Sequence, residues 1–135
     1  MAHFLFKTEP GDYAYADLER EKRTVWQGVK NPLALKHLAT AQVGDTVAFY
    51  HTGSEKSVVG LARVVAAPYA DPDLDDPRRL VVDLAPLRAL ARPVALSEFR
   101  RDPVLSATEL VRLPRLSVMP LSAPQFARIE KLANE

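Results

Sequence analysis

Trp26 is the only tryptophan in the chain, and the residues around it could bind a flat ligand. The surrounding segment, residues 24–32, reads TVWQGVKNP. In this segment a glycine, a basic residue and an amide side chain follow a large aromatic ring. The segment ends at a proline typical of a helix start. An indole at such a junction belongs either to the hydrophobic core or to the wall of a pocket that stacks a planar group. The function depends on which of the two is correct.

Three further groups of polar residues stand where apolar segments end. They are KTE at residues 7–9, YHTG at residues 50–53 and RLSVMP at residues 115–120. Taken one at a time, each is typical of a strand that ends in a loop. Together with the segment around Trp26, they indicate the rim of one binding site.

Calcium binding is the first of several chemistries that the sequence argues against. The acidic residues at positions 71, 73 and 75 have the spacing at which a calcium loop begins. However, Asp76 stands where such a loop needs glycine, and Val82 stands where it needs a bidentate glutamate. We therefore interpret residues 68–79 as an exposed acidic loop.

Other metal and cofactor motifs are also lacking. The three histidines, at positions 3, 37 and 51, do not have the spacing of metal ligands, and the chain has no cysteine. None of the five glycines forms a dinucleotide fingerprint or a phosphate-binding loop. We expect neither a metal ion nor a cofactor.

The composition is that of a globular protein of 135 residues, which corresponds to one domain over residues 1–135. The apolar run at the N-terminus is too short for a signal peptide, so we expect a cytoplasmic protein, and a monomer. The 18 basic and 17 acidic residues leave a net charge of +1. Proteins that follow a long phosphate backbone usually carry a clear excess of Lys and Arg. Any nucleic acid should therefore be bound through a pocket and a few phosphate contacts.

The elements that must position these residues can be predicted from apolar periodicity and turn residues. Two features are specific: Asn31 should cap a helix that starts at Pro32, and Ser122 with Gln125 should form a capping box. Asp12 is a candidate cap for the first helix. We predict strands at 3–7, 24–26, 46–51, 58–65, 80–84 and 87–90, and helices at 13–21, from 32, at 96–101, at 105–110 and from 123. This pattern favours a curved, mainly β sheet or barrel surrounded by short helices.

The polar segments also occur in a recognisable order. The series is FKTEP at 6–10, WQGVKN at 26–31, GDTVAFYHT at 44–52, VVGLARV at 58–64, VDL at 82–84 and RLSVMP at 115–120. This series resembles the EVE domain family, which includes thymocyte nuclear proteins and small bacterial relatives, and the resemblance extends from about Phe4 to Leu132. It implies an α+β, PUA-like twisted β-barrel of about five to six strands with peripheral short helices. The high content of Arg, Ala, Leu and Pro is typical of a bacterial protein.

The resemblance further implies a non-catalytic module that binds DNA or RNA carrying a modified base, notably a modified cytosine extruded into an aromatic pocket. By position, the base pocket would comprise Trp26, Thr8, Gly28, Val29, Asn31, Tyr50 and His51. The phosphate or backbone contacts would come from Lys7, Lys30, Arg115 and Ser117. Lys30 and Leu35 stand where the family often has arginine, so bidentate contacts are lost there.

Two other functions remain as alternatives. PUA-like relatives of the ASCH type are amidohydrolases that deacylate modified cytidines with Lys, Thr and Glu, the residue types found at positions 7–9. Consecutive strand residues point to opposite faces, so these three side chains converge only if the chain turns at Glu9. The second alternative is an adaptor that binds a protein partner through the acidic loop 68–79.

Overall fold

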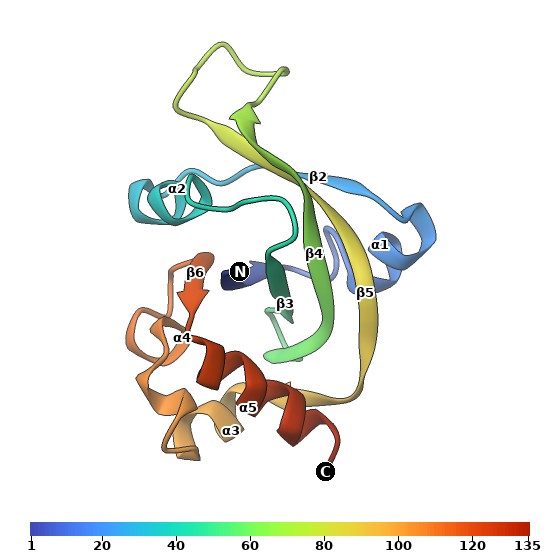
Figure 1. Cartoon of the computed structure of the whole chain (residues 1–135), viewed down its shortest axis with the longest axis vertical. Helices are drawn as coiled ribbons and strands as arrows, with labels where there is room; N and C mark the ends of the chain where they lie inside the picture. Colours follow the sequence, from blue (N-terminus) through green and yellow to red (C-terminus); the bar gives the residue numbers. More distant parts are fainter.

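The fold is organised around one mixed sheet of six strands, seen in a computed structural model that describes all 135 residues (Figure 1). The strands are β1 (His3–Thr8), β2 (Thr24–Trp26), β3 (Thr46–His51), β4 (Ser57–Ala70), β5 (Leu80–Ala95) and β6 (Val118–Leu121). Their order in the sheet is β2-β5-β4-β3-β1-β6. Strands β1 and β3 are parallel, and all other neighbours are antiparallel. The sheet curls strongly without closing, so the predicted α+β, PUA-like barrel fold is confirmed in an open form.

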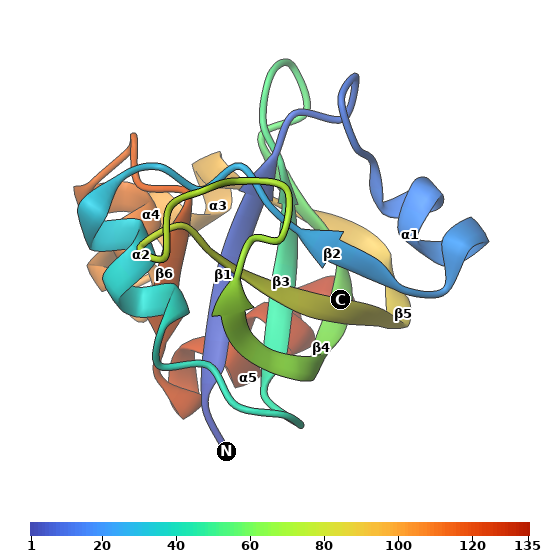
Figure 2. The same cartoon turned by 90° about the horizontal axis from the view of Figure 1, so that it is seen from above.

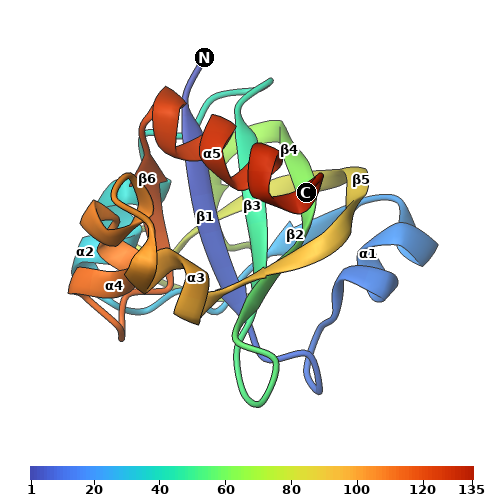
Figure 3. The same cartoon turned by 90° about the horizontal axis from the view of Figure 1, so that it is seen from below.

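Short helices surround the sheet, as predicted. They are α1 (Tyr15–Glu21), α2 (Pro32–Leu38), α3 (Leu96–Arg101), the 3-10 turn η1 (Leu105–Ala107), α4 (Glu109–Arg112) and α5 (Ala123–Ala133). Helix α2 lies beside β6, and α1 lies at the opposite side of the molecule, near β5 (Figure 2). Helix α5 crosses one face of the sheet (Figure 3). Helix α5 covers one face of β1 and β3, and the central residues of these strands, Phe4–Phe6 and Val47–Tyr50, are apolar and buried.

Local capping chemistry decides where the helices begin. The side chain of Asn31 accepts a hydrogen bond from the backbone N–H of Ala34 at 3.0 Å, and Ser122 and Gln125 form the expected capping box. The prediction that Asp12 caps the first helix is wrong. Asp17 instead accepts the N–H of Ala14, at 2.8 Å, and this leaves the carboxylate of Asp12 free for another role.

Strands β4 and β5 are longer than the sequence indicated. Strand β4 continues to Ala70, and the predicted strands at 80–84 and 87–90 are a single strand that passes through Pro86 and Pro93. A proline is tolerated in a sheet at an irregular position because it has no N–H to donate. The pairing of β4 with β5 shifts next to Pro86 and again between Val58 and Gly60, opposite the stretch that contains Pro93.

The segment around residues 118–121 also differs from its sequence interpretation. It forms β6, an edge strand paired with β1, whereas the sequence indicated only a polar cluster there. Pro120 lies within it, which agrees with the restriction of proline to edges. The pairing places Ser117 directly beside the end of β1.

A partly buried ion pair joins the C-terminal helix to the helices that follow β5. Arg128 donates to the carboxylate of Asp102 at 2.6 Å, and the same carboxylate accepts the backbone N–H groups of Val104 and Leu105. Burial disfavours the charged form of Asp102, but these donors outweigh it, so the pKa of this carboxyl lies below its usual value. The pair therefore stabilises the fold at neutral pH.

Candidate functional site

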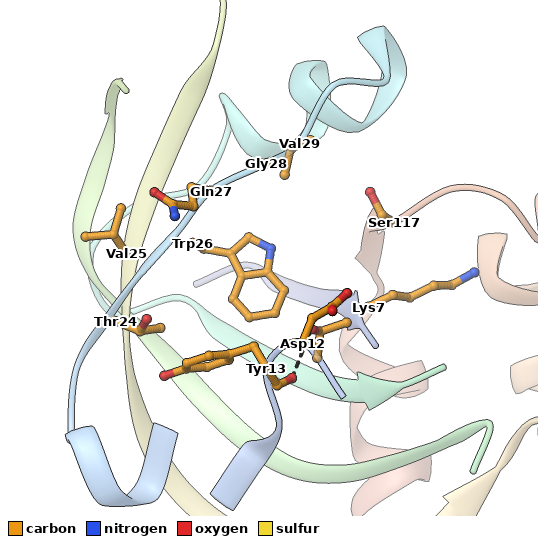
Figure 4. Close-up of a pocket in the computed structure, with 11 residues that line it drawn as sticks. Lys7, Asp12, Tyr13, Thr24, Val25, Trp26, Gln27, Gly28, Val29 and Ser117 are labelled. Carbon is orange, nitrogen blue, oxygen red and sulfur yellow. Dashed lines mark hydrogen bonds between the residues drawn. The ribbon is translucent and has the colours of Figure 1, made fainter. Parts of the chain in front are cut away.

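A pocket of about 430 Å³ opens beside Trp26 (Figure 4). It lies where the curl of the sheet brings β2 back towards β1. Its lining comes from the end of β1, the segment before α1, strand β2 with the loop that follows it, and the residue before β6. The volume lies within the range of roughly 300–1,000 Å³ that is typical of small-molecule sites. The lining residues are Lys7, Thr8, Asp12, Tyr13, Thr24, Val25, Trp26, Gln27, Gly28, Val29 and Ser117.

The indole of Trp26 belongs both to the core and to this pocket. Only 8% of the residue is exposed, and its ring centroid lies 5.6 Å from that of Phe6 and 5.4 Å from that of Phe49. Strand β2 is at one end of the sheet order and β1 is near the other, so these contacts require the sheet to curl. Tyr13 stands edge-on to the indole, at 86° and 6.4 Å. The indole is therefore rigidly held, and Tyr13 provides a second aromatic wall.

The loop that follows Trp26 offers unused hydrogen-bond donors. Gly28 has a φ of +84°, a conformation that glycine adopts readily, and the chain then turns towards α2. The backbone N–H groups from Gln27 to Lys30 donate to no acceptor in the protein. The carbonyl of Val29 accepts a hydrogen bond from Nε of Arg79 at 3.1 Å, which ties this loop to the β4–β5 hairpin. These N–H groups are therefore free to bond with a ligand that reaches them.

Lys7 and Thr8 line the pocket, but both side chains are already engaged. The ammonium of Lys7 donates to the carbonyl of Pro114 at 2.7 Å and lies 5.8 Å from the ring centroid of Tyr50. Partial burial lowers the pKa of Lys7 from its ordinary value. The hydroxyl of Thr8 donates to the carbonyl of Tyr13 at 3.0 Å, and so fixes the segment before α1 against β1.

Tyr50 and His51 lie next to the pocket in the sheet but do not line it. Pairing of β1 with β3 sets Lys7 opposite Tyr50 and Thr8 opposite His51. His51 is 7% exposed, its Nε2 accepts the backbone N–H of Tyr15 at 3.0 Å, and its Nδ1 is 3.1 Å from a carboxylate oxygen of Glu55. His51 therefore holds the segment that leads into α1. It affects the pocket only indirectly, by positioning that segment.

Three other predicted residues stand around the pocket in neighbouring hollows. Lys30 lines a second cavity together with Arg78 and Arg79. Asn31 and Arg115 line a third, apolar cavity, and the side chain of Asn31 serves as the cap of α2. Of the predicted site residues, the structure thus gathers into one pocket Trp26, Thr8, Gly28, Val29, Lys7 and Ser117.

Sequence reasoning missed five pocket residues: Asp12, Tyr13, Thr24, Val25 and Gln27. Thr24 and Gln27 flank Trp26 closely enough that the strand-to-loop pattern could have indicated them. Asp12 and Tyr13 gave no such signal. They reach the pocket only because Thr8 and His51 bind the backbone of the segment that carries them.

The residue types of an amidohydrolase do not meet at one point. Lys7 bonds to Pro114 and Thr8 to Tyr13, whereas the carboxylate of Glu9 contacts the N–H of Gly11 and the hydroxyl of Thr52. No three His, Asp or Glu side chains are grouped as a metal site would require. None of the helices has the length and apolar character needed to cross a membrane.

Comparison with known proteins decides the family. A sequence model described as the EVE domain matches residues 2–132. The chain belongs to the EVE domain family. This EVE domain is similar to human thymocyte nuclear protein 1, with 26% identity over 93% of the chain and 71% of the human protein.

Solved structures agree with this assignment. The domain superposes on Rpa0253 from Rhodopseudomonas palustris with a TM-score of 0.94 and 28% identity, covering 99% of this chain and 94% of the other. It superposes on human THYN1, solved in complex with DNA containing 5-methylcytosine, with a TM-score of 0.90 and 24% identity, covering 100% and 99% of the two chains. An ASCH protein from Zymomonas mobilis is more distant, with a TM-score of 0.60 and 14% identity over 96% and 94%, which shows a shared fold alone.

Proposed function

We propose that this EVE domain binds a nucleic acid strand by accepting one modified base, a modified cytosine, into the Trp26 pocket, and that it catalyses no reaction there. The observation that carries the proposal is the pocket itself, in which a rigid indole is followed by a loop whose backbone N–H groups have no acceptor in the protein. Human THYN1, whose fold is the same, was solved with DNA containing 5-methylcytosine. The small net charge of +1 also favours recognition through a pocket over recognition along a charged surface.

The energetics place a clear limit on what the aromatic ring can do. Extruding a base from its stack costs a few kcal/mol, less when the strand is already single. Stacking on Trp26 would return roughly 1–3 kcal/mol for any base. An added methyl group in an apolar niche contributes only about 0.8 kcal/mol, or about fourfold in affinity. Selectivity for a particular base must therefore come from hydrogen bonds at the pocket walls.

The proposed roles follow the pocket lining. Trp26 and Tyr13 would hold the faces and edge of the base, and the backbone at Gly28 and Val29 would meet its polar edge. Lys7 stands at the rim, where an ammonium can meet a phosphate without reading the sequence. In the neighbouring hollows, Lys30 and Arg115 would contact the flanking phosphates. Asn31, Tyr50 and His51 would support the walls.

Trp26 supplies its own probe for this proposal. Short oligonucleotides, DNA and RNA, with plain or modified cytosine, are titrated while Trp26 fluorescence is followed, and the anisotropy of labelled strands is measured in parallel. We expect saturable quenching that is stronger for the modified base. Absence of binding by both methods would overturn the proposal. Incubation with an acylated cytidine tests the non-catalytic part, and release of the free nucleoside would contradict it.

Matched substitutions locate the binding site on the protein. Trp26→Phe keeps an aromatic ring in the core and should weaken binding several-fold. Tyr13→Ala removes the second aromatic wall and should have a similar effect. Tyr69→Ala makes the same change on the β4–β5 hairpin, outside the pocket, and should leave the affinity unchanged. Equal losses for the two tyrosine variants would place the binding site elsewhere.

A further inference from the structure

One carboxylate of the pocket has no partner inside the protein. Asp12 lines the cavity beside Trp26, and its side chain is exposed. Other carboxylates nearby are paired: Asp17 bonds to Arg20 and Asp83 bonds to Arg23. Asp12 has no such cation and caps no helix. An ionised carboxylate can only accept hydrogen bonds, so Asp12 presents two unused acceptor oxygens to whatever occupies the pocket.

The wall on the other side of the indole is the loop that follows β2. Gln27, Gly28 and Val29 line the same cavity, and their backbone N–H groups donate to nothing in the protein. In Figure 4 the Gly28–Val29 backbone and Asp12 lie on different sides of the indole, with the pocket between them. A flat ligand beside the indole would thus have the loop backbone on one side and the carboxylate of Asp12 on the other.

This arrangement distinguishes between the two kinds of pyrimidine. Cytosine carries an amino donor at N4, followed along its edge by acceptors at N3 and O2. Thymine and uracil carry an acceptor at O4 and a donor at N3. We propose that Asp12 makes the pocket selective for cytosine-type bases over thymine and uracil, by accepting a hydrogen bond from the N4 amino group. The proposal rests on the binding of a base in this pocket.

The charge of Asp12 should have a cost for binding and a benefit for selectivity. A carboxylate near a strand of phosphates repels that strand, whichever base is present. In front of thymine it would face the O4 oxygen as well, so the unfavourable contact acts against the wrong base. Asparagine at this position would remove the repulsion and could present its amide donor to O4. Asp12→Asn should therefore weaken selectivity without weakening all binding.

The test uses two single-stranded oligonucleotides that differ only in one 5-methylcytosine or thymine. These two bases share the ring and the methyl group, so the comparison isolates the amino and carbonyl edges. We expect the unmodified protein to bind the 5-methylcytosine strand with about tenfold higher affinity than the thymine strand. This ratio is near the lower end of what one hydrogen bond to a charged group contributes. In Asp12→Asn the preference should fall to within about twofold, with thymine bound at least as tightly as before.

Two controls keep the result decisive. Glu19→Gln makes the same charge change at an exposed position of α1 and should retain the tenfold preference. Thermal unfolding checks that Asp12→Asn remains folded, as expected for a side chain without protein partners. No preference in the unmodified protein, or a tenfold preference retained in Asp12→Asn, would overturn the role of Asp12. If Asp12 has no such role but Trp26→Phe and Tyr13→Ala still weaken the binding of both oligonucleotides, the proposal that the pocket binds a base stands. If neither oligonucleotide binds the unmodified protein, that proposal fails as well.

Discussion

Replacing His51 by leucine tests how the walls of the pocket are held. In the structure Nε2 of His51 accepts the backbone N–H of Tyr15, so the ring proton lies on Nδ1 and points to Glu55. This bond joins the end of β3 to the start of α1. The segment before α1 carries Asp12 and Tyr13 into the pocket. The sequence alone suggested a direct base contact for His51, and the two roles predict different results.

The magnitude follows from the burial of the bond. His51 is 7% exposed, so His51→Leu leaves the N–H of Tyr15 without an acceptor in a place that water hardly reaches. An orphaned buried donor costs about 1–3 kcal/mol, and leucine fills a similar volume, so we expect a loss of about 2 kcal/mol. For a chain of this size that corresponds to roughly 6–10 °C in Tm. The side chain of Glu55 is 47% exposed, and Glu55→Gln should change the stability by less than about 0.5 kcal/mol.

Urea unfolding followed by Trp26 fluorescence measures both variants, and oligonucleotide affinity is measured on the folded proteins. We expect His51→Leu to lose stability and affinity together, because the same bond supports both. Unchanged stability in His51→Leu would refute the structural role. Loss of affinity at unchanged stability would instead mean that His51 touches the ligand.

Three further substitutions have definite expected outcomes. Gly60→Ala would place a Cβ 2.5 Å from the ring of Tyr15, so thermal unfolding should show a loss of at least about 1–3 kcal/mol, and an unchanged Tm would contradict this packing. Arg79→Met breaks the hydrogen bond to the pocket loop and should lower oligonucleotide affinity several-fold while stability changes by less than about 1 kcal/mol; Arg78→Met, on the same hairpin, is the matched control. Asp102→Asn should cost about 1–3 kcal/mol at neutral pH. The folded pKa of Asp102 is below its unfolded value of about 4. The contribution of this carboxylate to the free energy of unfolding therefore exists above that pH and is lost as the pH falls through the folded pKa. The stabilities of the unmodified protein and of Asp102→Asn, measured against pH, should therefore converge in acid.

The sequence predicted the parts of the fold that depend on near neighbours. Asn31 caps α2 and Ser122 with Gln125 opens α5, because a cap is a contact between residues three positions apart. The apolar runs of β1 and β3 are strands for the same local reason. The continuation of β5 through Pro86 and Pro93 was not predictable, because a proline is acceptable only where the partner strand is out of register, and the register is set by β4.

By itself, the sequence determined that an indole is followed by a loop containing glycine, that polar residues end the strands, and that the series of motifs resembles that of an EVE domain. Only the tertiary structure decided that the indole is both core and pocket wall, because the curl of the sheet sets Trp26 against Phe6. It also decided which side chains face the cavity. His51 binds the backbone at the start of α1, while Asp12, which the sequence offered only as a helix cap, lines the pocket without a partner. The direction of a side chain depends on contacts between segments far apart in the chain, and no local pattern of residues specifies those contacts.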